Sequence, residues 1–188
     1  MPPKVRITKD DIIKAALELV RKDGEEALNA RALATVLGSS TQPIFSNFAN
    51  MTEVYEQIII EGERLYGEYA KKEIETGAYP SVYKASGMAY IRFAKEEREL
   101  FKLLFMRDRS VEGYGETRLF YQMVTEVQST VPLSEDSAKL FHLEIWAFVH
   151  GIASMFITGY LNLEWDMVSR MVSDAFHGLK SRYEGQKE

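Results

Sequence analysis

Apolar residues recur every three or four positions along most of the chain, which is the spacing of one face of an α-helix. Upstream of residue 50 this pattern predicts three short helices. The first begins after a cap at Thr8, runs to about Asp23 and ends at Gly24. Its inward positions are Ile12, Ile13, Ala16, Leu17 and Val20.

A glycine separates the second predicted helix from the third. Asn29 caps the second helix, and Gly38 permits a sharp turn into a third helix over residues 41–48, which Ser40 is placed to cap. Two helices joined by such a turn have the spacing of a helix-turn-helix, whose second helix enters the major groove of DNA. The same spacing also fits an ordinary three-helix packing unit without a role in nucleic-acid binding.

Polar and apolar side chains lie on opposite sides of the third helix. Ile44 and Phe48 are four residues apart and share the apolar side, whereas Gln42 and Ser46 point the other way. A helix this short is unstable alone in water, so it must be held by a scaffold. Its polar side is therefore a candidate binding surface.

Downstream of residue 50 the pattern predicts six further helices and no internal repeat. We predict an all-α protein of about nine helices, with one domain at residues 1–50 and a helical domain at residues 51–188. The long fourth helix would join them. The six predicted helices cover residues 51–76, 81–95, 97–107, 116–129, 134–159 and 164–183.

The helix predicted at residues 134–159 combines large apolar residues with small ones. Small side chains allow another helix to approach closely, either from the same chain or from a second copy. The large apolar residues on one broad side of this helix are Leu140, Phe141, Ile145, Phe148 and Ile152. The candidate dimer-interface residues on this helix and the last one are Ala147, Gly151, Ser154, Met167, Met171 and Ala175.

Two stretches resemble one protein family. The run LNARALATVLGSSTQPIFSNFANMTEVYEQI resembles the N-terminal signature of the TetR family of bacterial transcriptional regulators, and WAFVHGIASMF resembles a C-terminal pattern in part of it. The resemblance implies an N-terminal three-helix helix-turn-helix DNA-binding domain and a C-terminal helical bundle for ligand binding and dimerisation. It also implies a repressor that binds operator DNA as a homodimer and is released by a small molecule. Phe45 replaces the usual Tyr and Met51 the usual Lys, which removes a hydroxyl and a cation that could contact phosphates.

The DNA-binding hypothesis assigns roles to the third helix and its surroundings. The Gln42 amide could pair with adenine, and Pro43 could contact a thymine methyl group. Thr41 is a candidate for bases or phosphates. The full candidate set is Lys4, Arg6, Asn29, Arg31, Ser40, Thr41, Gln42, Pro43, Phe45, Ser46, Asn47 and Thr52.

Charge weighs mildly against DNA binding. The chain of 188 residues carries a net charge of −5, although residues 1–50 hold seven Lys and Arg against six Asp and Glu, a net of +1. We therefore expect a shallow salt dependence of DNA binding. The absence of cysteine, of a secretory signal and of any run of 18 apolar residues leads us to expect a cytoplasmic protein without a membrane span.

No motif for catalysis, phosphate binding or metal binding is present, so neither an enzyme nor a cofactor is expected. A pocket for a small apolar or aromatic ligand between helices remains possible, although the same side chains would equally form a filled core. The alternative to a regulator is a helical small-molecule-binding protein or enzyme with a vestigial helix-turn-helix. The candidate ligand-binding residues are Tyr66, Met88, Phe93, Phe101, Phe105, Phe120, Met123, Trp146 and His150.

Overall fold

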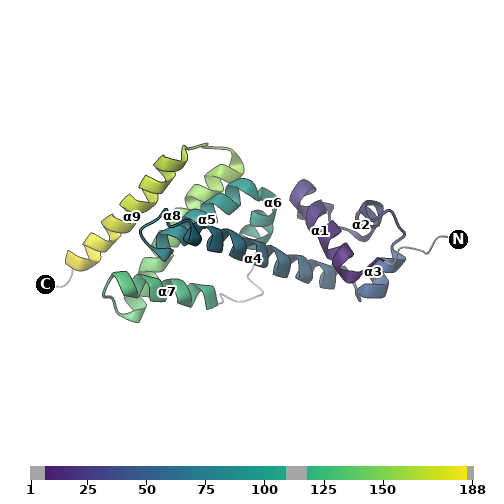
Figure 1. Cartoon of the computed structure of the whole chain (residues 1–188), viewed down its shortest axis with the longest axis horizontal. Helices are drawn as coiled ribbons and strands as arrows, with labels where there is room; N and C mark the ends of the chain where they lie inside the picture. The colour runs from purple at the N-terminus through teal and green to yellow at the C-terminus, as the bar shows by residue number, and fades with distance from the viewer. Residues whose placement is uncertain (1–6, 109–117, 186–188) are drawn as a thin grey trace. The chain divides into compact units, whose positions relative to one another are not determined.

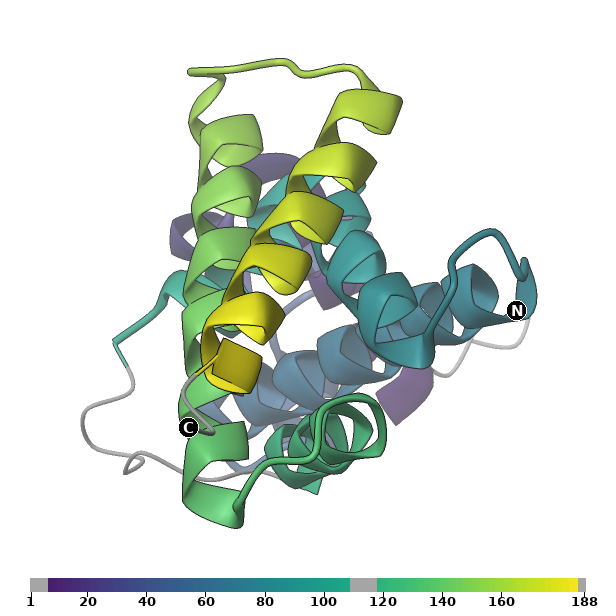
Figure 2. The ribbon, with the colours of Figure 1, turned by 90° about the vertical axis from the view of Figure 1, so that its left-hand side faces the viewer.

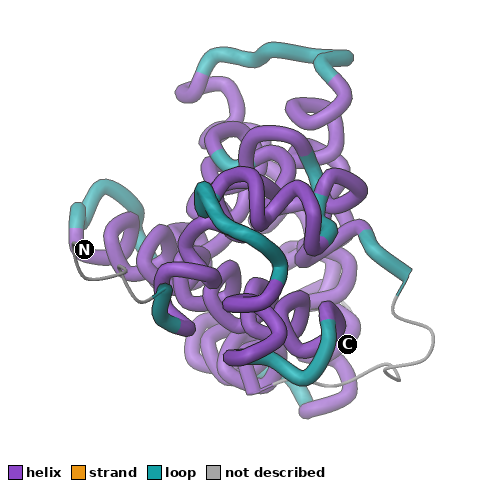
Figure 3. Tube along the Cα trace, turned by 90° about the vertical axis from the view of Figure 1, so that its right-hand side faces the viewer, coloured by secondary structure: helices purple, strands orange, loops and turns teal. Residues whose placement is uncertain are grey.

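The computed structural model describes residues 7–108 and 118–185, and every regular element in these ranges is a helix (Figures 1 and 3). The prediction of an all-α fold is confirmed. The elements are α1 (Lys9–Asp23), η1 (Glu25–Ala27), α2 (Ala30–Val36), α3 (Gln42–Asn47), α4 (Met51–Glu75), α5 (Val82–Glu96), α6 (Arg98–Phe101), η2 (Lys102–Met106), α7 (Arg118–Thr130), α8 (Glu135–Thr158) and α9 (Trp165–Gly185).

The chain forms two compact units. The N-terminal unit comprises Met1–Gly67 and Glu97–Arg107, and the C-terminal unit comprises Glu68–Glu96 and Asp108–Glu188. Helix α4 passes from one unit to the other after Gly67. The predicted domain boundary between residues 50 and 51 stays a prediction.

Helix α1 begins as its sequence predicts. The Thr8 hydroxyl accepts a hydrogen bond from the Asp11 backbone N–H, and the Asp11 carboxylate accepts one from the Thr8 N–H. This reciprocal capping box satisfies two backbone donors that the helix itself leaves without partners. Ile12, Ala16 and Val20 are fully buried on one side of α1 and form the centre of the small N-terminal core.

The turn between α2 and α3 depends on glycine. Gly38 has a φ of +59°, a conformation that other residues adopt only with strain. Its N–H donates to the Thr35 carbonyl at 3.1 Å. The expected cap of α3 is wrong in detail: Thr41 is the N-cap and makes no side-chain cap bond, while the Ser40 hydroxyl accepts a long 3.4 Å bond from the Gln42 N–H.

Residues 97–107 belong to the N-terminal unit and are not one regular helix as predicted. A single turn of α6 passes into the π-helical turn η2. Leu104 of η2 approaches Gly62 of α4 so closely that a Cβ at Gly62 would lie 3.3 Å from its methyl groups. A glycine at this position therefore allows η2 to pack against the first part of α4.

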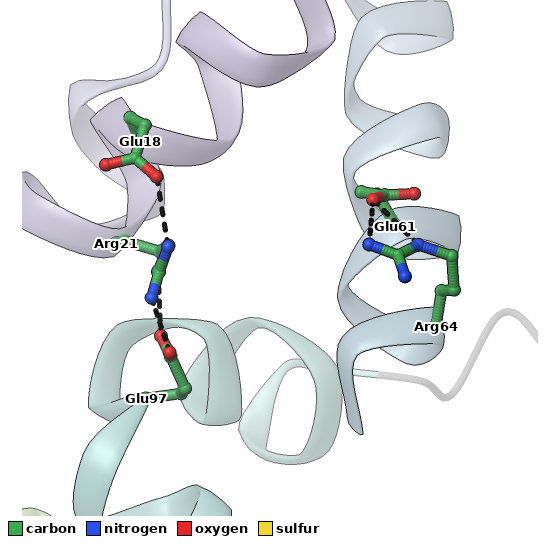
Figure 4. A network of polar contacts seen from close by, with 5 residues as sticks. All are labelled: Glu18, Arg21, Glu61, Arg64 and Glu97. Atoms are coloured by element: carbon green, nitrogen blue, oxygen red, sulfur yellow. Dashed lines mark hydrogen bonds and ion pairs between the residues drawn. The ribbon is translucent and has the colours of Figure 1, made fainter. Parts of the chain in front are cut away.

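An ion pair joins α1 to the start of α6 (Figure 4). The Arg21 guanidinium donates two hydrogen bonds to the Glu97 carboxylate, at 2.8 and 2.5 Å, and a third to Glu18 at 3.0 Å. The Glu97 side chain is only 9% exposed and Arg21 is 37% exposed. A planar guanidinium that holds both oxygens of a carboxylate fixes position as well as charge.

The C-terminal unit is built around α5 and α8, with α7 and α9 packed beside them (Figure 2). Met88, Ile91 and Phe93 of α5 are fully buried, as is Phe141 of α8. Figure 2 shows α8 in light green and α9 in yellow running side by side. The core of this unit therefore lies between α5 and the pair α8–α9.

One side of α8 is apolar and exposed. Leu140, Leu143 and Phe148 are 50%, 44% and 37% exposed. With a mean hydropathy of 1.5 over an 18-residue window, α8 is long and apolar enough to cross a membrane by length and composition only, and 39% of that window is buried. A single such helix is weak evidence for a membrane span, because core helices of soluble proteins have the same length and composition.

The pair Arg21–Glu97 yields the first prediction. Arg21→Ala should lower the free energy of unfolding by about 1–3 kcal/mol, because the buried Glu97 carboxylate loses its partner. Glu97→Gln should lower the free energy of unfolding by less, because the half-exposed Arg21 can still form hydrogen bonds with water or Glu18. Denaturation in guanidinium chloride measures both, with Lys22→Ala, an exposed cation of the same helical turn, as the control. Equal losses for all three variants would contradict the prediction.

Candidate nucleic-acid interface and ligand region

Helix α3 is held by its apolar side and exposes its polar side. Ile44 and Phe48 are 0% and 2% exposed, whereas Gln42 and Ser46 are exposed, as the spacing predicts. Among the described residues the Gln42 side chain makes no hydrogen bond. Phe45 is 49% exposed on the flank of this surface. The scaffold therefore presents an amide, a hydroxyl and an aromatic ring to the exterior.

Two other polar side chains of α3 bond within the helix. The Ser46 hydroxyl donates to the Gln42 carbonyl at 2.9 Å. The Asn47 amide donates to the Pro43 carbonyl at 2.8 Å and, over 3.5 Å, to the Ile7 carbonyl. The amide N–H groups of Asn47 are thus directed at the backbone, and sequence spacing could not show this.

The remaining candidates for DNA binding lie at the edges of the motif. The Asn29 side chain caps α2, accepting from the Ala32 N–H at 3.0 Å, so its oxygen is engaged. Arg31 and Thr52 are exposed, and Thr41 is half-buried beside the turn. Lys4 and Arg6 lie outside the described residues.

A cation near the start of α1 is engaged inside the unit. The Lys9 ammonium lies 3.3 Å from the Glu53 carboxylate and 4.7 Å from the centre of the Phe48 ring. Glu53 in turn accepts from the Ala49 N–H at 2.8 Å, and these bonds lower the pKa of its carboxyl. This group of contacts ties the end of α3 to α1 and α4.

The candidate ligand residues are divided between the two units. Tyr66, Phe101 and Phe105 belong to the N-terminal unit, where Phe105 packs its ring against both others at centroid distances of 5.2 and 4.9 Å. The remaining six belong to the C-terminal unit. Met88, Phe93 and Phe101 are fully buried, so these three side chains fill core positions.

The centre of the C-terminal unit contains a polar pair that our sequence analysis missed. The Tyr83 hydroxyl lies 3.0 Å from His142 Nδ1, and both residues are buried. The Phe120 ring packs on His142 at 5.1 Å. Burial lowers the pKa of His142 to about 4, so the imidazole is neutral at pH 7. The sequence shows only that Tyr83 and His142 lie on two predicted helices, which does not indicate that the two side chains meet.

A second tyrosine–histidine pair lies nearer the surface. The Tyr90 hydroxyl is 2.8 Å from His150 Nδ1, and Trp146 stacks on the same imidazole at 5.2 Å. Trp146 is 43% exposed, so one candidate ligand residue borders the exterior of α8. Burial also lowers the pKa of His150. No group of His, Asp and Glu suited to a metal ion occurs in the described parts of the chain.

Three of the candidate interface residues, Ala147, Gly151 and Ser154, lie on the exposed apolar side of α8, and the other three lie on α9. Ala147 and Gly151 follow Leu140 and Leu143 at helical spacing, and no atom lies within 4 Å of a Cβ built on Gly151. Ser154 continues the same side. On α9, Met167 is 53% exposed, and Met171 and Ala175 are half-buried. These residues leave an open, apolar surface with room for close approach.

Comparison with known proteins identifies this architecture. The family model for the tetracyclin repressor-like C-terminal domain matches residues 83–177. The fold is similar to that of a TetR-like transcriptional regulator from Rhodococcus sp. RHA1, with 16% identity, a TM-score of 0.69 and coverage of 95% of this chain and 98% of that one. A protein with unknown function from the same organism shares 24% identity, with a TM-score of 0.70 and coverages of 93% and 95%. No curated protein matches.

Burial of His142 makes stability depend on pH. The pKa is about 4 in the folded chain and about 6.5 when unfolded, so the unfolded state binds more protons between these values. The free energy of unfolding should therefore fall by roughly 2 kcal/mol from pH 6.5 to pH 4 through this residue. His142→Phe should reduce that slope, whereas Tyr83→Phe should keep it, because burial rather than the hydroxyl causes the shift. Denaturation curves across this pH range measure both slopes. Identical slopes for wild type and His142→Phe would contradict the assignment.

Proposed function

This chain belongs to the TetR family of transcriptional regulators, and we propose that it is a ligand-responsive repressor that binds operator DNA as a homodimer in the cytoplasm. The observation that carries the proposal is the exposed side of α3, on which Gln42 and Ser46 face outward from a buried Ile44–Phe48 anchor. A short helix held in this way is suited to the major groove. In a dimer, two such helices would enter successive grooves about 34–36 Å apart.

Specific binding would combine few phosphate contacts with base recognition. Gln42 is the proposed adenine-binding residue, because its amide N–H can donate to adenine N7 while its carbonyl oxygen accepts from adenine N6, which is the bidentate pattern that glutamine forms with adenine. Arg31 and Thr52 are exposed and placed at the edges of the motif to contact the backbone. Lys4 and Arg6 would add cations from the N-terminal segment. The small positive charge of residues 1–50 favours a shallow salt dependence.

We propose that the exposed side of α8, with the adjoining part of α9, contacts the same surface of a second copy. Leu140 and Leu143 are large apolar side chains that water would otherwise cover, and Gly151 leaves space for a facing helix. In a dimer with a two-fold axis, both copies contribute the same surface to the interface. One apolar surface on each chain is therefore sufficient to form the dimer. Two helices from each copy would then form a four-helix interface.

Regulation requires a ligand that binds the conformation unable to bind DNA more tightly than it binds the conformation that binds DNA. The C-terminal unit offers apolar and aromatic side chains with polar groups at Tyr83 and His142 for a small apolar or aromatic ligand. Two covalent routes lead from this unit to the DNA-binding elements: α4, and the junction of α5 with α6, where Glu97 holds Arg21 of α1. Operator binding titrated with and without a candidate ligand tests this coupling, and an unchanged dissociation constant for every ligand that binds would refute it.

Gln42→Ala tests DNA recognition. On a duplex selected from a randomised library, this variant should bind about 10-fold more weakly and discriminate less between adenine and other bases at one position of each half-site. Fluorescence anisotropy at low salt measures both effects. Gln122→Ala, an exposed glutamine of α7, is the matched control and should bind as wild type. Failure of the wild-type chain to bind any duplex would favour the helical small-molecule-binding alternative.

Gly151→Glu tests the dimer. The position is open in the single chain and glutamate favours helix more than glycine, so the fold should be kept. In sedimentation velocity the variant should behave as a monomer, whereas the wild type should behave as a dimer. Operator affinity should fall by at least about 100-fold, because a dimer that contacts two linked half-sites binds far more tightly than a monomer that contacts one. Gly67→Glu introduces the same charge at another open helical position, on α4, and should remain dimeric. A dimeric Gly151→Glu protein would place the interface elsewhere.

A further inference from the structure

Phe45 is an aromatic residue that the N-terminal unit leaves half-exposed. Its side chain is 49% exposed, whereas Phe48, three residues later, is 2% exposed. Within the described part of the chain its ring contacts no other aromatic ring and no cation. It lies on the flank of the same α3 surface that presents Gln42. Exposing half of a phenylalanine ring to water is unfavourable. The free energy therefore falls when an apolar group covers the ring.

The chemistry of the α3 surface restricts what that group can be. Phenylalanine has no hydroxyl and cannot donate to a phosphate oxygen. In the major groove of B-DNA the 5-methyl group of thymine is the apolar group that the bases present. Ser46 and Asn47 direct their donors at backbone carbonyls of α3 itself. Pro43, the other apolar candidate on α3, is half-buried, whereas Gln42 and Phe45 are exposed. Gln42 and Phe45 are therefore the side chains best placed to distinguish bases.

We propose that Phe45 recognises thymine through its methyl group, beside the adenine bound by Gln42. The inference rests on the proposed DNA-binding function and specifies its base chemistry. Side chains at positions i and i+3 of a helix lie about 5–6 Å apart, and base pairs stack about 3.4 Å apart. The thymine thus lies one or two base pairs from the adenine. Each half-site is predicted to contain two A·T pairs, one or two base pairs apart.

Replacement of thymine by deoxyuridine tests the proposal, because it removes only the methyl group. The complete chain first selects a duplex from a randomised library, and each thymine of one half-site is then replaced singly. At one thymine, next to the adenine that Gln42→Ala identifies, the dissociation constant of the wild-type chain should rise about 3- to 5-fold. For Phe45→Ala the same replacement should have no effect. Phe45→Tyr keeps the ring and should keep the sensitivity to deoxyuridine.

The control variant is Ile60→Ala, which shortens an exposed apolar side chain of the same unit on α4 and should respond to deoxyuridine as wild type. If no single replacement weakens wild-type binding, or if Phe45→Ala responds as wild type does, Phe45 does not contact a thymine methyl and the inference is wrong. In both cases operator binding itself persists, so the proposed function stands. If the wild-type chain selects no duplex, the proposed function and this inference fail together.

Discussion

The buried anchor of α3 is the constraint on which the DNA-binding hypothesis depends. A helix of six residues has too few internal hydrogen bonds to persist alone, so its orientation comes from Ile44 and Phe48 in the core of the N-terminal unit. Lys9 strengthens this attachment, because it covers the Phe48 ring and pairs with Glu53 at the start of α4. The outward direction of Gln42 is a consequence of this packing. Any change that loosens the anchor also loosens the candidate DNA surface.

The same unit includes a segment that is remote in sequence. Residues 97–107 pack with α1 and the first part of α4, although they follow α5 of the C-terminal unit along the chain. Their attachment combines a bidentate ion pair at Arg21 with the close approach of Leu104 to Gly62. The chain returns to the DNA-binding elements at Glu97, directly after α5. Under the proposed function, this connection is the route by which a displacement at the end of α5 would reach α1.

The C-terminal unit uses its aromatic residues in two ways. Around Tyr83 and His142 they enclose a polar pair whose imidazole is neutral because it is buried. On the exposed side of α8 the apolar side chains are only partly covered by the described residues, and Leu140 there is 50% exposed. Under the proposed function, the first arrangement supplies a polar group to orient the ligand. The second supplies the apolar surface for the proposed partner subunit.

Local patterns along the sequence determined most of the helical elements, the capping of α1 by Thr8, the glycine turn at Gly38 and the two sides of α3, because these depend on neighbouring residues. Tertiary packing decided the rest. Periodicity identifies the side chains that share a face but not the segment that covers them, so it did not show that Leu140 is half exposed, that residues 97–107 form two short turns or that Glu97 pairs with Arg21. The buried pair Tyr83–His142 is 59 residues apart in sequence, and only the fold brings such distant groups within hydrogen-bond distance.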